Sequence, residues 1–139
     1  MDHDDLPPLE LAFPGPERDS GVAAILSGHK TALTGLLALY RHAGEELPTA
    51  GQRLSVLDSA NRPVATIELV DVRVVPMAEI DDAFALAEGR GYEDAAHWRA
   101  AHTEFFQSTG VSEYLGHTPV IDDSTLVVAQ QFRLVDPTP

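Results

Sequence analysis

Apolar residues recur at helical spacing in the first third of the chain. A short strand is expected at Glu10–Phe13, before Pro14. Asp19 or Ser20 is a suitable N-cap for a helix that Gly28 ends. A second helix is expected from about Thr31 to Gly44, because the intervening apolar positions fit the 3.6-residue period. Those positions are Leu33, Leu36, Leu37 and Tyr40.

The middle of the chain and its last part show strand patterns instead. Residues 53–58 alternate apolar and polar, and residues 59–63 have turn chemistry. Residues 64–75 are rich in β-branched side chains and long for one strand, so we expect a bend near Val70-Asp71 that splits the segment into two strands. A last strand is expected over 125–135. We expect these segments to share one sheet.

Two helices are expected between those strands. One carries Ile80 and Phe84 on one face and ends at Gly89, and the other covers about 93–108. Trp98 and His102 stand at i and i+4 on the second helix. We favour packing of Trp98 in the core, with stacking of this pair on a nucleic-acid base as the alternative. The whole pattern indicates an α+β fold: a small curled sheet or barrel with helices packed on it.

Composition narrows the class of protein. The chain has 139 residues, 44% of them hydrophobic, which indicates one globular domain. It has no cysteine and no apolar run of the ~18–20 residues that a membrane span requires. The acidic N-terminus lacks the pattern of a secretory signal. These features predict a soluble, cytoplasmic protein without disulfides or a zinc–thiolate site.

The net charge of the chain limits the partners that it can bind. With 22 acidic residues against nine Lys and Arg, the net charge of −13 opposes binding to duplex DNA and to anionic membranes. Charges further apart than ~8 Å are largely screened at physiological salt, so a local pocket could still hold a nucleotide or a short single strand.

The sole lysine lies in the most informative segment. If Gly28 ends one helix and Thr31 begins the next, Lys30 lies at a helix N-terminus, where free N–H groups favour an anion. Thr31 and Thr34 would then lie one turn apart and add hydroxyl donors. The alternative is a capped turn with a solvated lysine.

This segment resembles the G-x-K-T-A-T signature of the ASCH (activating signal cointegrator homology) domain family, and further motifs in the same order resemble that family. They are GEELPTAG at 44–51, NRPVATIE at 61–68, the V-x-x-V-P…A-x-x-E-G block at 72–89, and W-R-A-A-H with Phe105-Phe106. The resemblance covers roughly residues 11–135. We therefore expect an acidic, flexible N-terminus at 1–9, a domain at 10–135 and a tail at 136–139.

The resemblance implies a PUA-like small β-barrel with a cleft for RNA or a nucleotide-like ligand. Some relatives deacylate N4-acetylcytidine through a lysine, a threonine three residues later and a glutamate, and others are described as ribonucleases. Carried over, the lysine is Lys30 and the glutamate is Glu88, but the threonine position is Leu33. Thr34 and Thr31 are the possible substitutes. The predicted catalytic residues are Lys30, Thr34 and Glu88.

Several residues are predicted to line the ligand site. They are Lys30, Thr31, Thr34, Glu88, Arg90, Trp98 and His102. Arg90 could reach a phosphate or could simply be solvated. The six histidines show no paired-ligand spacing, so we expect no metal and no cofactor. An amidohydrolase acting on N4-acylated cytidine, a ribonuclease, and a non-catalytic protein-interaction module remain as alternatives to a nucleotide- or RNA-binding domain.

Overall fold

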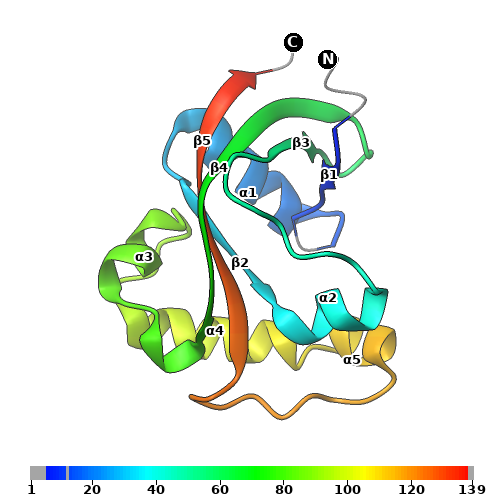
Figure 1. Cartoon of the computed structure of the whole chain (residues 1–139), viewed down its shortest axis with the longest axis vertical. Coiled ribbons are helices and arrows are strands. Elements are labelled where there is room, and N and C mark those ends of the chain that lie inside the picture. The colour runs from blue at the N-terminus through cyan, green and yellow to red at the C-terminus, as the bar shows by residue number, and fades with distance from the viewer. Residues whose placement is uncertain (1–5, 12, 138–139) are drawn as a thin grey trace.

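A five-stranded sheet forms the centre of the molecule in the computed structural model, which describes residues 6–11 and 13–137 (Figure 1). The sheet order is β1-β3-β4-β5-β2, and every neighbouring pair is antiparallel except β1 and β3. The strands are β1 (Pro8–Leu9), β2 (Ala32–Leu36), β3 (Arg53–Leu57), β4 (Pro63–Pro76) and β5 (Leu126–Pro137). The helices are α1 (Pro16–Ser27), α2 (Leu37–Ala43), α3 (Asp82–Ala87), α4 (Ala95–Phe106) and α5 (Thr109–Leu115), with a 3₁₀ turn, η2, at Met77–Glu79.

The predicted α+β class is confirmed, but the predicted barrel is wrong. In the described part of the chain the sheet is open, because its two edge strands, β1 and β2, do not pair with each other. The edges are also short: β1 has only two residues, and β2 has five. Strands this short offer few backbone groups with which to close a barrel.

The central strands agree with the pattern of the sequence. The segments predicted at 53–75 and 125–135 share the sheet, as expected. The long segment is one strand, β4, whose pairing with β5 shifts register between Leu69 and Asp71. The predicted split into two strands near Val70-Asp71 is therefore wrong: the irregularity there is bulge-like, and a bulge bends a strand without ending it.

Two hydrophobic cores cover the two faces of the sheet. Ala32 of β2 belongs to a core with Phe84 of α3 and Trp98 of α4. The next residue, Leu33, belongs to the other core with Ile25 of α1. Because successive strand residues point to opposite faces, α1 packs on one side of the sheet and α3 and α4 pack on the other.

The helix predicted from Thr31 is wrong in its first half. Residues 32–36 form β2, which pairs with β5, and only residues 37–43 are helical. The spacing of the leucines fits a helix, but Ala32 and Leu33 are both buried, on opposite faces of the strand. Burial on both faces and pairing with β5 override the helical pattern.

The other elements follow the predictions with shifted ends. The predicted helices at 80–87 and 93–108 are α3 and α4, and α5 was not predicted. The short N-terminal strand lies at Pro8–Leu9 instead of Glu10–Phe13, so the chain enters the sheet before the expected domain start. Gly28 ends helix α1, as predicted, but the predicted N-cap at Asp19 or Ser20 is wrong: the helix begins at Pro16, after Gly15. No helix in the described ranges is long and apolar enough to cross a membrane.

Candidate functional site

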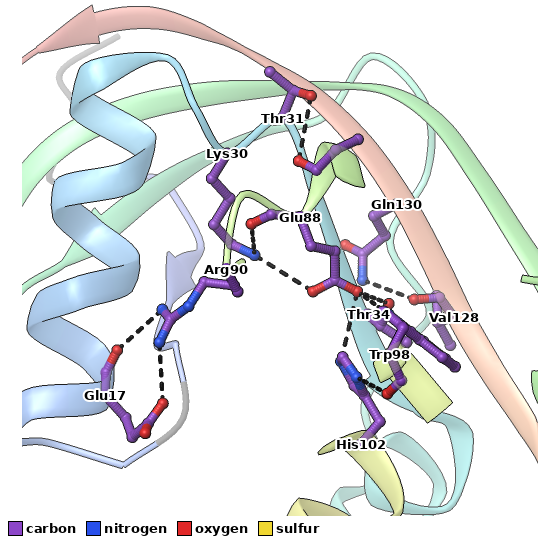
Figure 2. A network of polar contacts seen from close by, with 11 residues as sticks. Glu17, Lys30, Thr31, Thr34, Glu88, Arg90, Trp98, His102, Val128 and Gln130 are labelled. Atoms are coloured by element: carbon purple, nitrogen blue, oxygen red, sulfur yellow. Dashed lines mark hydrogen bonds and ion pairs between the residues drawn. The ribbon is translucent and has the colours of Figure 1, made fainter. Parts of the chain in front are cut away.

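Glu88 lies at the centre of a buried polar network between α3, β2 and α4 (Figure 2). Helix α3 begins at Asp81, whose side chain accepts a hydrogen bond from the Phe84 N–H, and Glu88 is its C-cap. A carboxylate at a helix C-terminus faces an unfavourable dipole, so helix stability does not explain its place. The side chain is only 4% exposed and turns toward β2 and α4.

Lys30 forms a buried ion pair with Glu88. Its Nζ lies 3.5 Å from Glu88 Oε1, and Nζ also donates to the Glu88 backbone carbonyl at 3.2 Å. The two side chains are 5% and 4% exposed. Lys30 is therefore not a solvated surface lysine, and its partner comes from 58 residues along the chain.

The helix N-terminus predicted beside Lys30 is absent from this part of the chain. Lys30 instead follows the C-terminal end of α1, and its N–H donates to Ala24 O. The Thr31 N–H donates to Ala87 O. Both amides are engaged, so they offer no free donors to an anion. The positive groups of the site are side chains alone.

Thr34, rather than Leu33, supplies the hydroxyl of the site. Lys30, just before β2, and Thr34, in β2, both contact Glu88, whereas Leu33 points to the opposite face of the strand because neighbouring strand residues alternate. Thr34 Oγ1 donates to Glu88 Oε2 at 2.7 Å. Leu33 is 6% exposed in the core under α1. Although Leu33 stands at the family's threonine position, the neighbouring Thr34 thus places a threonine hydroxyl on the Glu88 carboxylate.

Helix α4 adds two more partners for the carboxylate. Trp98 Nε1 donates to Glu88 Oε2 at 2.5 Å, and His102 Nε2 lies 3.5 Å from the same oxygen. His102 Nδ1 contacts the Trp98 carbonyl at 2.9 Å, which orients the ring. The two rings are stacked, with centroids 4.2 Å apart.

These donors set the ionisation of the site. Burial raises the pKa of Glu88, but hydrogen bonding and charge from His102, the charge of Lys30 and the Trp98 hydrogen bond outweigh it and lower the pKa to about 2. Burial lowers the pKa of Lys30, and the charge of Glu88 opposes that effect. A carboxylate with so low a pKa is a weak base at neutral pH. Glu88 is therefore held as an anion by the donors around it.

Gly89 brings the Glu88 backbone against Lys30. Its φ is +64°, and a Cβ at this position would lie 2.3 Å from His29 O and 2.8 Å from Lys30 N. No side chain fits there, and L-residues rarely adopt this φ. The Glu-Gly pair of the sequence therefore has a physical reason: only glycine lets the chain after α3 touch the His29-Lys30 segment between α1 and β2.

Trp98 does not present a face to a ligand. It is 0% exposed and lies in the core with Phe84, so the favoured prediction of core packing is confirmed for its position. Its indole N–H also donates a hydrogen bond to the Glu88 carboxylate. His102 is buried as well, at 8%.

The accessible edge of the site carries Thr31, Arg90 and Tyr92. Thr31 is exposed and Tyr92 is half-buried. The Arg90 guanidinium donates to the Glu17 backbone carbonyl at 3.3 Å and to its carboxylate at 3.0 Å, so Arg90 is not simply solvated (Figure 2). It lies on Gly21 of α1, where a Cβ would be 2.8 Å from Arg90 Nη1.

Sequence reasoning missed Glu17, Gly21 and Tyr92. The Tyr92 ring lies 5.5 Å from the His102 ring. Burial, followed by the charge of Glu88, raises the pKa of Tyr92 to about 12. The position of Tyr92 directly after Gly89-Arg90-Gly91 is a feature of the sequence from which its place near Glu88 could have been predicted. Nothing in the sequence connects Glu17 with Arg90, 73 residues away.

Comparisons with known proteins agree with the motifs. A family model described as the ASCH domain matches residues 10–136. The crystal structure of protein EF3133 from Enterococcus faecalis V583 superposes with a TM-score of 0.74 at 30% identity, over 90% of this chain and 72% of that one. The crystal structure of an ASCH domain from Lactobacillus crispatus JV V101 gives a TM-score of 0.72 at 28% identity, over 90% of this chain and 77% of that one. No curated protein matches the chain.

Proposed function

The chain belongs to the ASCH domain family, and from this membership and the network around Glu88 we propose that it binds RNA or a nucleotide-like ligand beside Lys30 and Glu88. The observation that carries the proposal is the convergence of Lys30, Thr34 and Glu88, which come from two distant segments. Three polar side chains held this closely form a preorganised recognition surface.

The partly exposed side chains near Glu88 support a nucleobase-like ligand. Single-stranded RNA is recognised through the donor and acceptor edges of its bases and through stacking on aromatic rings and on arginine guanidinium groups. Thr34, Arg90 and Tyr92 are each partly exposed and offer a hydroxyl, a guanidinium and a phenol ring. The buried ion pair behind them fixes the position of the Thr34 hydroxyl.

The charge of the chain favours a single strand or a mononucleotide over a duplex. Binding to duplex DNA depends on many Lys and Arg contacts to phosphates. The chain has nine such residues against 22 acidic ones. Lys30 and Arg90 are both engaged in ion pairs within the protein. Recognition would therefore come from stacking and hydrogen bonds in one site.

A second function, deacylation of an N4-acylated cytidine, is favoured by one observation. Thr34 Oγ1 donates to the Glu88 carboxylate, with which Lys30 forms its ion pair. In that reaction the Thr34 oxygen would attack the acyl carbonyl, the carbonyl–nitrogen bond would break, and the cytosine amine would leave with the proton taken from Thr34. Water would then hydrolyse the acyl ester on Thr34, which releases the carboxylic acid and restores the hydroxyl. Removal of the Thr34 proton would need a base; Glu88 Oε2 accepts the hydrogen bond of this proton, and Lys30 lies beside the same carboxylate.

A titration of matched variants tests the proposal. Cytidine, cytidine monophosphate, a short single-stranded RNA and a duplex DNA of equal length are titrated by calorimetry at about 50 and about 200 mM salt. We expect the nucleotide or the single strand to bind more tightly than the duplex. Thr34→Val is expected to weaken that binding about tenfold or more. Thr103→Val, on α4 away from Glu88, is the control.

Two outcomes would contradict binding at this site. One is tight duplex binding with a steep dependence on salt. The other is an equal loss of affinity in the Thr34 and Thr103 variants. Hydrolysis of N4-acetylcytidine, followed by chromatography in the same samples, separates the two functions: turnover lost in Thr34→Val favours deacylation, and ligand binding without turnover favours a binding domain.

A further inference from the structure

An open cavity lies away from Glu88, between α2, the end of α5 and the start of β5. Its volume is about 480 Å³, within the range of small-molecule sites. Leu36, Leu37 and Leu115 line it and are 1%, 5% and 9% exposed. None of the residues of the Glu88 network lines it. The cavity is thus a separate feature with an apolar wall.

The polar groups of this cavity are basic or neutral. Arg41, His42 and His117 line it, together with the Thr125 hydroxyl, and no carboxylate does. This is a local reversal of charge in a chain with a net charge of −13. Most surfaces of such a chain repel an anion, so a basic cavity stands out as a place where an anion is tolerated.

Arg41 is available to a ligand. Within residues 6–11 and 13–137, the side chains of Lys30 and most arginines make ion pairs or hydrogen bonds, whereas the side chains of Arg41 and Arg99 make neither. An arginine without a partner presents its whole planar donor set, which matches a carboxylate or a phosphate.

Helix stability accounts for only part of this arrangement. Arg41 and His42 lie in the last turn of α2, where a cation is favourable. His117 comes from the loop after α5, yet it lines the same cavity. The His42 ring packs edge-on against Tyr114 of α5, with centroids 4.9 Å apart, which joins the two segments beside the cavity. Convergence of basic side chains from two segments is not explained by either helix alone.

From the apolar wall and the basic rim we propose that this cavity binds a small amphipathic anion. Its ligand has a compact apolar body, which contacts Leu36, Leu37 and Leu115, and one carboxylate or phosphate, which pairs with Arg41. The site is distinct from the proposed nucleotide site, and its occupation does not depend on that function.

The test uses four probes with the same apolar chain. Octanoate, octyl phosphate, octanol and octylammonium are titrated separately into the full chain, with amide shifts and calorimetry as readouts. We expect both anions to bind with shifts confined to α2, α5 and the start of β5. Octanol should bind about tenfold more weakly, and octylammonium should not bind. The ratio between octanoate and octyl phosphate identifies the preferred headgroup.

Matched variants decide whether Arg41 carries the headgroup. Arg41→Gln is expected to weaken octanoate about tenfold and to leave octanol unchanged. His117→Gln should weaken octanoate less. Arg99→Gln, which removes the other arginine without a partner, should have no effect. The proposal is overturned if no probe binds, if octylammonium binds as well as octanoate, or if Arg41→Gln and Arg99→Gln act alike. Thermal melting confirms that each variant is folded.

Discussion

Thr34 donates its hydroxyl to the carboxylate of Glu88 across 2.7 Å, although 54 residues separate the two in sequence. Strand β2 and the C-terminal end of α3 meet here because Gly89 leaves no side chain between them. The contact places a hydroxyl on the carboxylate that Lys30 and Trp98 also bind. It also shows that the residue of β2 to test is Thr34 and not Leu33.

Thr34→Val is expected to affect the site, whereas Leu33→Thr is expected to affect only the core. Thr34→Val removes the hydroxyl from Glu88 and should reduce any ligand binding or deacylation, with a stability loss of about 1–3 kcal/mol. Leu33→Thr puts a hydroxyl into the core under α1, so it should cost about 2–4 kcal/mol and create no activity. Urea unfolding and an N4-acetylcytidine assay measure both effects. Hydrolysis gained by Leu33→Thr would contradict the placement of Leu33 on the opposite face.

Glu88→Gln should remove an acid-sensitive part of the stability. The folded carboxyl has a pKa of about 2, below its ordinary value of 4.5, so the folded state binds fewer protons than the unfolded chain. Its contribution is complete above pH 4.5 and is lost as the pH falls toward 2. The amount is on the order of 3 kcal/mol, because each unit is worth about 1.4 kcal/mol.

Urea titrations at a series of pH values between neutrality and pH 2 measure this contribution. The wild type should lose stability more steeply below pH 4.5 than Glu88→Gln does. Glu104→Gln, an exposed acid of α4, is the control and should follow the wild type. Parallel curves for wild type and Glu88→Gln would mean that the carboxyl is not held ionised by its neighbours.

Replacing Lys30 should cost more stability than replacing a surface lysine. With a solvated lysine, Lys30→Ala would leave stability unchanged within about 0.5 kcal/mol. Because Lys30 and Glu88 are both buried, we expect Lys30→Met to cost about 3–5 kcal/mol by leaving Glu88 uncompensated. The double variant with Glu88→Gln should lose less than the sum of the two single changes. Arg73→Met, which breaks the exposed pair with Asp71, should cost less than about 1 kcal/mol.

The long periodic elements could be predicted from the sequence, while the site could be predicted only in part. The strands β3, β4 and β5 and the helix α4 have patterns that match their burial, so local reasoning identifies them. Strand β2 fails that reasoning because its leucines fit a helix and its strand state depends on pairing with β5, far along the chain. The family motifs singled out Lys30 and Glu88, but their contact, and the turn of Thr34 toward them, depend on that same pairing.

Gly89→Ala should disrupt the network more than a change at the neighbouring glycine. Both Gly89 and Gly91 have positive φ, +64° and +84°, so each substitution carries strain of about 1–3 kcal/mol. Only at position 89 does a Cβ also clash, at 2.3 Å from the backbone oxygen of His29, whereas position 91 has nothing within 4 Å. We expect Gly89→Ala to cost clearly more in urea unfolding than Gly91→Ala. It should also change the fluorescence of Trp98, the single tryptophan.

Gly21→Ala tests the position of Arg90 without removing its charge. Glycine inside a helix costs roughly 1 kcal/mol relative to alanine, so the change favours α1. The new Cβ would lie 2.8 Å from Arg90 Nη1 and 3.0 Å from Leu11 Cδ1, and both atoms are ends of flexible side chains that can move. Stability should therefore change little, while Arg90 is displaced from its place beside Glu17.

If Arg90 recognises the phosphate of a nucleotide, Gly21→Ala should weaken the binding of cytidine monophosphate and leave the binding of cytidine unchanged. Arg90→Gln should do the same. Equal losses for both ligands in calorimetry would show that these changes disturb the site as a whole, and unchanged affinity for both would exclude Arg90 from phosphate recognition.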